Sequence, residues 1–107
     1  MYRGSSTFLN GTASATDTNN ASVIAAQGSG VKIHVSFLVI SNSSATNAEV
    51  LIKDGTTTKL TIPAPATGGA VCHLDPPLVL SDNAALNFAS GTSVTTMKVS
   101  AIGYKGE

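Results

Sequence analysis

Hydrophobic and polar positions alternate most clearly over residues 31–40, the longest dense run of β-branched and aromatic residues in the chain. All five odd positions of this run are large and apolar, and its first three even positions are polar. The odd positions are Val31, Ile33, Val35, Phe37 and Val39. A period of two residues predicts a strand with one face on a core and the other in water. Leu38 and Ile40 interrupt the alternation, so we expect a central strand whose far end is covered on both faces.

Seven further segments have a strand-like composition and are separated by turn residues. They are residues 21–26, 48–53, 57–62, 70–74, 78–80, 84–89 and 94–104. Asp54-Gly55 separates two of them and is a strong short-range signal for a hairpin. Residues 63–69 predict a loop because two prolines cannot serve a central ladder, and residues 75–77 predict the end of the strand before them. The last segment rivals the central one in length, so we expect the two to be neighbours.

Eight short strands at regular spacing predict an all-β fold, a single-domain antiparallel β-sandwich that is jelly-roll-like. A chain of 107 residues suits one domain, and we place the sandwich at residues 21–107. No window shows a sustained helical period, and Thr, Ser and Val dominate where a helix would favour Leu, Glu and Lys. A seven-stranded immunoglobulin-like sandwich is the alternative, but neither a Trp nor a cysteine pair supports it.

Residues 1–20 differ from the rest of the chain and predict an extended, flexible N-terminal arm. Residues 12–20 are small, polar and without period, so they bury too little apolar surface to order themselves. Phe8 and Leu9 lie inside the arm with nothing local to pack on. They either tuck back onto the domain or dock on a partner, and a simply frayed terminus is the alternative.

The composition is neutral and poor in charge, which narrows the classes of partner. Charged residues make up 11% of the chain and the formal net charge is zero. A nucleic-acid binder normally carries a basic excess, and no stretch approaches the roughly 18 apolar residues of a membrane span, so we expect neither partner. An uncharged surface is easily desolvated because few ions must lose their water. This favours a protein that works in an assembly, and a neutral secreted or viral β-domain is an equally good interpretation.

The sequence contains no catalytic, cofactor-binding or metal-binding pattern, so we expect a protein that is not an enzyme. His34 and His73 are the only histidines, and nothing in their spacing indicates that they meet. Cys72 is the only cysteine, which excludes an intrachain disulfide and a four-cysteine zinc site. Strand alternation sends Cys72 and His73 to opposite faces, which argues against a nucleophile pair. No spacing of the acidic residues supports paired carboxylates for glycoside cleavage.

Several short phrases of the sequence recur in a known class of protein. They are ASVIAA at 21–26 with a glycine turn after it, VKIHVSFLVIS at 31–41, GGAV-x-H-x-DPP-x-x-L at 68–80, and IGY at 102–104. In these phrases the chain resembles small structural proteins of tailed-phage virions. The resemblance spans residues 21–104, about four-fifths of the chain. It consists of short phrases and the residue pattern of the strands rather than a catalytic motif.

The resemblance implies a non-enzymatic capsid decoration (cement) protein that binds and stabilises the capsid shell. It implies the major capsid protein as partner, a homotrimer as the oligomeric state, and a place on the capsid surface of a virion assembled in the host cytoplasm. It transfers no individual binding residue to this sequence. A head-fibre or tail-associated module is the alternative within a virion.

We expect partner contacts in the arm and in the loops at 41–47 and 63–69. The candidate residues are Arg3, Phe8, Leu9, Asn42, Pro63 and Pro65. An alternative from a different class is a carbohydrate-binding β-sandwich, whose sugar platform would expose several aromatic rings. Phe37 and Phe88 are expected in the core, which leaves too few aromatic side chains for such a platform.

Overall fold

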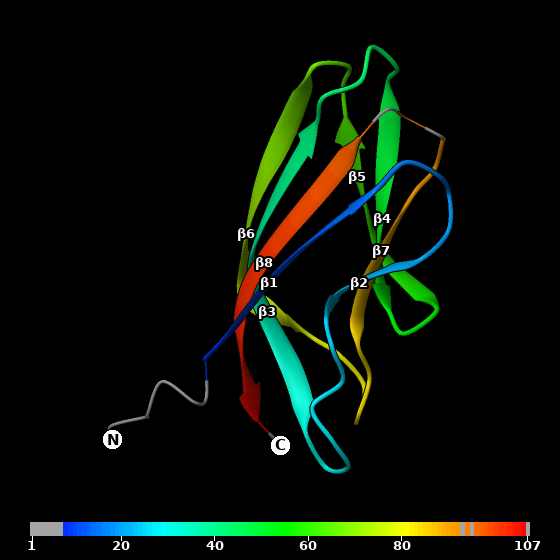
Figure 1. Ribbon diagram of the computed structural model, residues 1–107. Helices are drawn as coiled ribbons and strands as arrows, with labels where there is room; N and C mark the ends of the chain where they lie inside the picture. Colours follow the sequence, from blue (N-terminus) through cyan, green and yellow to red (C-terminus); the bar gives the residue numbers. More distant parts are fainter. Residues whose placement is uncertain (1–7, 93, 95, 107) are drawn as a thin grey trace.

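The computed structural model describes residues 8–92, 94 and 96–106, which form eight strands and no helix (Figure 1). The strands are β1 (Phe8–Ala15), β2 (Ala21–Ile24), β3 (Lys32–Asn42), β4 (Ala48–Asp54), β5 (Thr57–Ala64), β6 (Gly68–Val79), β7 (Leu86–Ser90) and β8 (Met97–Gly106). They make two four-stranded sheets with the orders β1-β8-β3-β6 and β2-β7-β4-β5. All pairings within the sheets are antiparallel. The predicted single-domain antiparallel β-sandwich is therefore confirmed.

The strand order is that of a jelly roll, as the sequence predicts. Hydrogen-bonded pairs join β1 to β8, β2 to β7, β3 to β6 and β4 to β5, the pattern of one long ribbon rolled up from its hairpin end. The Asp54-Gly55 turn lies at that hairpin, between β4 and β5, and Gly55 has a φ of 64°. The central strand β3 lies between β8 and β6, so the expected pairing with the last strand is confirmed.

A β-bulge at Ser36 corrects the predicted faces of β3. The register of β3 shifts between Val35 and Phe37 against both of its neighbours, which leaves Ser36 without an opposite residue. An extra residue in a strand reverses the side-chain alternation that follows it. The buried residues of β3 accordingly change from odd to even positions along the strand. They are Ile33 and Val35 before the bulge, and Leu38, Ile40 and Asn42 after it. Phe37 and Val39, predicted to lie in the core, point away from it.

Two predicted strand ends are also wrong, because prolines are tolerated at sheet edges. β5 is the edge strand of its sheet and continues through Pro63, which lies opposite Glu49 of β4. Residues 70–74 and 78–80 are not separate strands, since β6 runs through Pro76 and Pro77 to Val79. β6 is an edge strand as well, and its pairing with β3 is interrupted between His73 and Leu78.

The predicted boundary of the N-terminal arm differs from the structure over residues 8–15. These residues form β1 and pair with β8 without a register shift, from Phe8 opposite Tyr104 to Ala15 opposite Met97. Backbone pairing with β8 orders this segment although its side chains are small, a tertiary contact that local composition does not reveal. Residues 16–20 connect β1 to β2, and residues 1–7 lie outside the described residues.

The core lies between the two sheets and is built from aliphatic side chains around one aromatic ring. Its buried hydrophobic residues are Val23, Ile24, Ile33, Val35, Leu38, Ile40, Val50, Ile52, Ile62, Ala64, Leu80, Leu86, Phe88, Val94, Met97, Val99 and Ala101. Phe88 of β7 is the largest fully buried side chain. Within the described residues, no buried side-chain nitrogen or oxygen lacks a hydrogen-bond partner.

Gly11 allows β1 to approach β2 at one corner of the sandwich. A Cβ atom at this position would fall on the backbone carbonyl oxygen of Val23. We therefore expect Gly11→Ala to lower the free energy of unfolding by about 1–3 kcal/mol, because β1 must move away from β2. Chemical denaturation with Gly91→Ala as control measures this, since a Cβ at Gly91 would meet only ordinary contacts. Equal stability of the two variants would contradict the close approach.

Candidate interaction surfaces

The sheet β1-β8-β3-β6 presents one side to the core and the other to solvent, and we call the latter the outer face. Its residues are Phe8, Asn10, Thr12 and Ser14 of β1, Lys98, Ser100, Ile102 and Tyr104 of β8, His34, Phe37, Val39 and Ser41 of β3, and Gly69, Val71, His73 and Val79 of β6. The register aligns them in four rows across the strands. One row runs from Phe8 through Tyr104 and His34 to Val79.

The outer face holds every large hydrophobic side chain that is exposed among the described residues. Their exposed fractions are 61% for Phe8, 37% for Val39, 65% for Val71, 45% for Val79, 52% for Ile102 and 37% for Tyr104. Single exposed hydrophobic residues are common on protein surfaces, whereas their concentration on one side marks an interaction surface. This gathering on one sheet therefore makes the outer face the first candidate functional site.

Aromatic rings from all four strands strengthen this assignment. His34 stacks on Tyr104 with ring centroids 4.7 Å apart and an angle of 7° between the ring planes. Phe37 and His73 meet edge to face with centroids 6.1 Å apart. Aromatic residues are enriched at protein interfaces, where they contribute large contact area with few rotatable bonds. The two ring pairs connect neighbouring strands and hold these side chains in place.

Charged side chains lie at the margins of the outer-face sheet and not at its centre. Lys98 lies in the row farthest from Tyr104, Lys32 lies on the same side of β3 as His34 at the opposite end, and the exposed Asp75 lies on β6 where the pairing with β3 is interrupted. The other sheet carries Glu49 and Lys53 on the solvent-facing side of β4, and the Lys53 ammonium donates to Asn20 Oδ1 at 2.9 Å. Since uncharged residues are easier to desolvate, the two middle rows of the outer face, which contain no Lys, Arg, Asp or Glu, are suited to a dry contact.

A second candidate surface is the tip of the sandwich, formed by the loops at residues 43–47 and 65–67 (top of Figure 1). The buried Asn42 side chain organises it by using all four of its hydrogen-bonding positions. Its amide nitrogen donates to the carbonyl oxygens of Thr46 and Ala64, both at 2.9 Å. Its side-chain oxygen accepts from the backbone N–H of Ser44 at 3.0 Å and from the Ser44 hydroxyl at 2.9 Å. One side chain thus fixes the first loop and ties it to β5.

Direct hydrogen bonds between the two loops make the tip a defined shape. The Thr67 N–H donates to the Ser44 carbonyl oxygen at 2.8 Å, and the Ala66 N–H donates to Asn47 Oδ1 at 2.9 Å. The exposed residues of the tip carry no charge, and they are Ser43, Ala45, Thr46, Asn47, Pro65 and Thr67. The tip is therefore a pre-organised, uncharged surface that loses little conformational freedom on contact with a partner.

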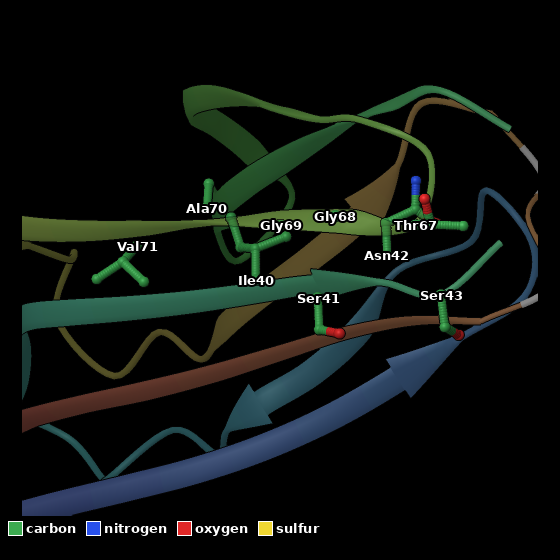
Figure 2. Close-up of a pocket in the computed structure, with 9 residues that line it drawn as sticks. All are labelled: Ile40, Ser41, Asn42, Ser43, Thr67, Gly68, Gly69, Ala70 and Val71. Carbon is green, nitrogen blue, oxygen red and sulfur yellow. The ribbon is translucent and has the colours of Figure 1, made fainter. Parts of the chain in front are cut away.

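An open groove of about 670 Å³ connects the tip to the outer face (Figure 2). It runs over β3 and β6 between Ser43 and Thr67 at one end and Val71 at the other. Gly68 and Gly69 leave the backbone exposed in the groove, and a Cβ at Gly69 would fall on the carbonyl oxygen of Ile40. Glycine is thus required at position 69 by the close pairing of β6 with β3. The groove is open at this point because glycine has no side chain.

The structure brings some of the predicted contact residues to these surfaces and removes others. Phe8 lies on the outer face, whereas Leu9 is half-buried and packs against the core. Asn42 is 1% exposed, so its side chain shapes the tip and does not reach a partner. Pro63 is exposed on β5 and Pro65 is exposed on the tip. Arg3 lies outside the described residues.

The ionisable side chains of the described residues do not form a metal-binding cluster. No three His, Cys, Asp or Glu side chains among these residues are placed to hold a metal ion. His34 and His73 share the outer face, but His34 stacks on Tyr104 whereas His73 meets Phe37 edge to face. Cys72 packs against the core, opposite to the exposed His73, as the strand alternation predicts. The part of the chain that the structure describes forms no helix long and apolar enough to cross a membrane.

Most of the outer face does not follow from the sequence pattern, because it depends on the bulge at Ser36 and on the register between strands. An alternation continued through Ser36 predicts that Phe37 and Val39 lie in the core, whereas both lie on the outer face. The signal was present in Leu38 and Ile40, whose even positions mark the change of face after the bulge. Val71 and Ile102 alternate with half-buried or buried neighbours, and only the register shows that they lie on the same side.

Comparison with known proteins adds no identification. No protein-family model matches the chain, and no curated protein sequence matches it significantly.

Proposed function

We propose that this protein is a non-enzymatic structural component of a phage virion, which binds and stabilises the capsid shell as a decoration protein. The observation that carries the proposal is the outer face, where the described exposed large hydrophobic residues gather and the charged residues lie at the margins. A small soluble protein that acts alone rarely keeps such a surface in water. A protein that spends its working life in an assembly buries it.

The resemblance to small virion proteins indicates which kind of assembly we propose for this protein, namely a phage virion. Three of the phrases that carry it lie in β3, β6 and β8 of the outer-face sheet, those in β3 and β6 contribute to the groove beside the tip, and the fourth lies in β2 of the other sheet. A decoration protein stabilises a shell by adding contacts that exist only in the assembled state, which favours that state by mass action. The proposed partner is the major capsid protein, and the proposed location is the capsid surface.

The tip is the surface that we assign to the capsid contact. It is uncharged, fixed by the Asn42 hydrogen bonds, and stands at the far end of the long molecule from Gly106 (Figure 1). Pro65 belongs to it, and Pro63 lies on the strand that leads into it. A projecting, pre-organised end can enter a depression between capsid subunits without an ordering cost.

A charge placed on the tip should weaken capsid binding without loosening the fold. We expect Ala45→Glu to reduce binding to capsids that lack the protein by about tenfold or more, because the new carboxylate must be desolvated at the contact. Thr61→Glu on the other sheet's solvent-facing side is the matched control. The measurement is co-sedimentation with purified capsids, with thermal melting to verify folding. Equal binding of both variants would remove the tip as the contact.

The homotrimer implied by the resemblance stays a prediction, as does the alternative of a head-fibre or tail-associated module. Sedimentation of the purified protein gives the number of copies directly. Labelling of intact virions distinguishes the shell from a fibre or tail, because decoration covers the capsid surface whereas the alternatives label one or a few points.

A carbohydrate-binding module is the second candidate, and one structural observation favours it. Phe37 lies on the outer face rather than in the core, so Phe8, Phe37, Tyr104 and the two histidines form a larger ring-bearing surface than the sequence predicts. Sugar faces stack on exposed aromatic rings. Binding of the isolated protein to a glycan array, lost in Tyr104→Ala, would support this function over capsid decoration.

A further inference from the structure

We propose that the outer face is a self-association surface, and that its partner is the same face of a second copy of this chain across a two-fold axis. This inference does not depend on the virion assignment, because it rests on the residue pattern of the face alone. It assigns the outer face to a second copy, which makes the protein a dimer in place of the homotrimer that the resemblance implies, and it leaves the tip for a different partner.

The pattern places a projecting ring and a hollow at opposite corners of the face. Phe8 lies at the end of the row that contains Tyr104, on the edge strand β1, and is 61% exposed. Gly69 lies at the opposite corner, on the other edge strand β6, in the row of Ser41 and Lys98. The groove over Gly68 and Gly69 is open, and neither glycine places a side chain in it. Each copy thus offers one knob and one hole.

A two-fold axis lying in the contact plane, perpendicular to the Phe8–Gly69 diagonal, exchanges these two corners. The ring of Phe8 in one copy then covers Gly69 of the other, and the reverse contact forms at the same time. The same operation sets Ile102 against Val39 of the second copy, since these two residues lie on the same diagonal nearer the centre. An isologous contact of this kind satisfies both copies at once and closes at two.

The remaining side chains are compatible with this arrangement. Phe37 lies beside its own counterpart near the axis, and Tyr104 faces the region of Val71 in the second copy, so apolar groups meet at the centre. Lys98 and Lys32 both lie at the margins, where they extend past the edge strands of the second copy and keep their water. No two lysine ammonium groups are therefore brought together, a juxtaposition that would oppose pairing. With strands about 4.8 Å apart and rows about 7 Å apart, the two sheets cross at roughly 70°, near the orthogonal class of sheet packing.

The size of the face sets the strength of the contact. Four strands and four rows, with their side chains, cover roughly 500 Å² in projection. A standard stable interface buries about 800 Å² per partner. The pair should therefore be weak and concentration-dependent, with a dissociation constant in the micromolar range or above, and it becomes strong where many copies are held close together.

Charge complementation tests the proposed symmetry. Val39→Glu and Ile102→Lys each introduce a charge at the centre of the face, and each variant alone should sediment as a monomer. Mixed in equal amounts, the two variants should recover a heterodimer, because a carboxylate in one copy then faces an ammonium in the other. Sedimentation from about 1 to 500 µM covers the expected range. Thr61→Glu, on the opposite sheet, is the control that should leave dimerisation unchanged.

Each result of this experiment decides the proposal. A wild-type dimer that both single variants abolish and that the mixture restores supports the two-fold face-to-face pair. Any one of four other results overturns it. They are a wild-type trimer, a wild-type monomer over the whole concentration range, a dimer that survives both variants, and a mixture that stays monomeric. Circular dichroism melting verifies folding, and Val71→Lys offers a second disruptive variant at the most exposed hydrophobic residue of the face.

Discussion

Replacing Phe88 by alanine should lower the free energy of unfolding by about 3–5 kcal/mol, the largest effect that we expect from a single hydrophobic truncation in this chain. Phe88 lies on β7 at the centre of the core and is the largest of the fully buried side chains. Truncation removes its apolar area and leaves a cavity that the two rigid sheets cannot close. Urea denaturation monitored by circular dichroism measures the loss.

The matched control is Phe37→Ala, which removes the same atoms from the outer face. We expect a loss below about 2 kcal/mol, because Phe37 is half-buried and a cavity at the surface fills with water. The comparison tests the bulge at Ser36 directly. If β3 kept one alternation from end to end, Phe37 would lie in the core and the two variants would be equally destabilised. Such a result would contradict the outer face as described.

Replacing Asn42 by alanine should have the second large effect, a loss of about 2–5 kcal/mol. The substitution removes the donors to Thr46 and Ala64 and the acceptor for Ser44 at a site that is 1% exposed. Their polar groups then stay buried without this partner. We also expect faster amide hydrogen exchange at residues 43–47, because the loop loses its main anchor.

Asn47→Ala is the control for this prediction. Asn47 makes a single exposed hydrogen bond, to the Ala66 N–H, so its removal should cost about 1 kcal/mol or less. A loss of equal size in both variants would mean that the tip is held by contacts between loops rather than by the buried amide. The same pair of variants then shows how far the proposed capsid binding depends on a pre-formed tip.

The sequence was sufficient to predict the class of the fold and the centre of the sheet. Strand-rich composition, the Asp54-Gly55 turn and regular spacing predicted a jelly-roll-like sandwich, and the long run at 31–40 predicted a central strand beside the last one. Both predictions are confirmed. These features are local or nearly so, since a strand needs only a period of two residues and a turn needs only its own residues.

The sequence was not sufficient where pairing between distant segments decides the outcome. Residues 10–15 are small or polar, and the pairing of residues 8–15 with β8 makes this segment a strand. Ser36 looks like any polar position, and only the shifted register on both sides identifies the bulge. Asn42 was predicted as a partner contact because it follows a strand, yet the carbonyl oxygen of Ala64 draws it inside.

The candidate surfaces follow from those two unpredicted features. Without the bulge, Phe37 and Val39 would be core residues and the outer face would lack its centre. Without β1 in the sheet, Phe8 would not lie beside Tyr104. The outer face is thus a property of strand register, which explains why the sequence pattern indicated contacts in the arm and the loops but did not indicate this face.

The central claim is that this chain belongs to a virion as one of its abundant structural proteins. Quantitative mass spectrometry of phage particles purified by density gradient tests it most directly, with the major capsid protein as internal reference. The account predicts that the chain remains with intact particles through the gradient, at a copy number on the scale of the major capsid protein. Recovery of the chain only among free proteins at the top of the gradient would contradict it.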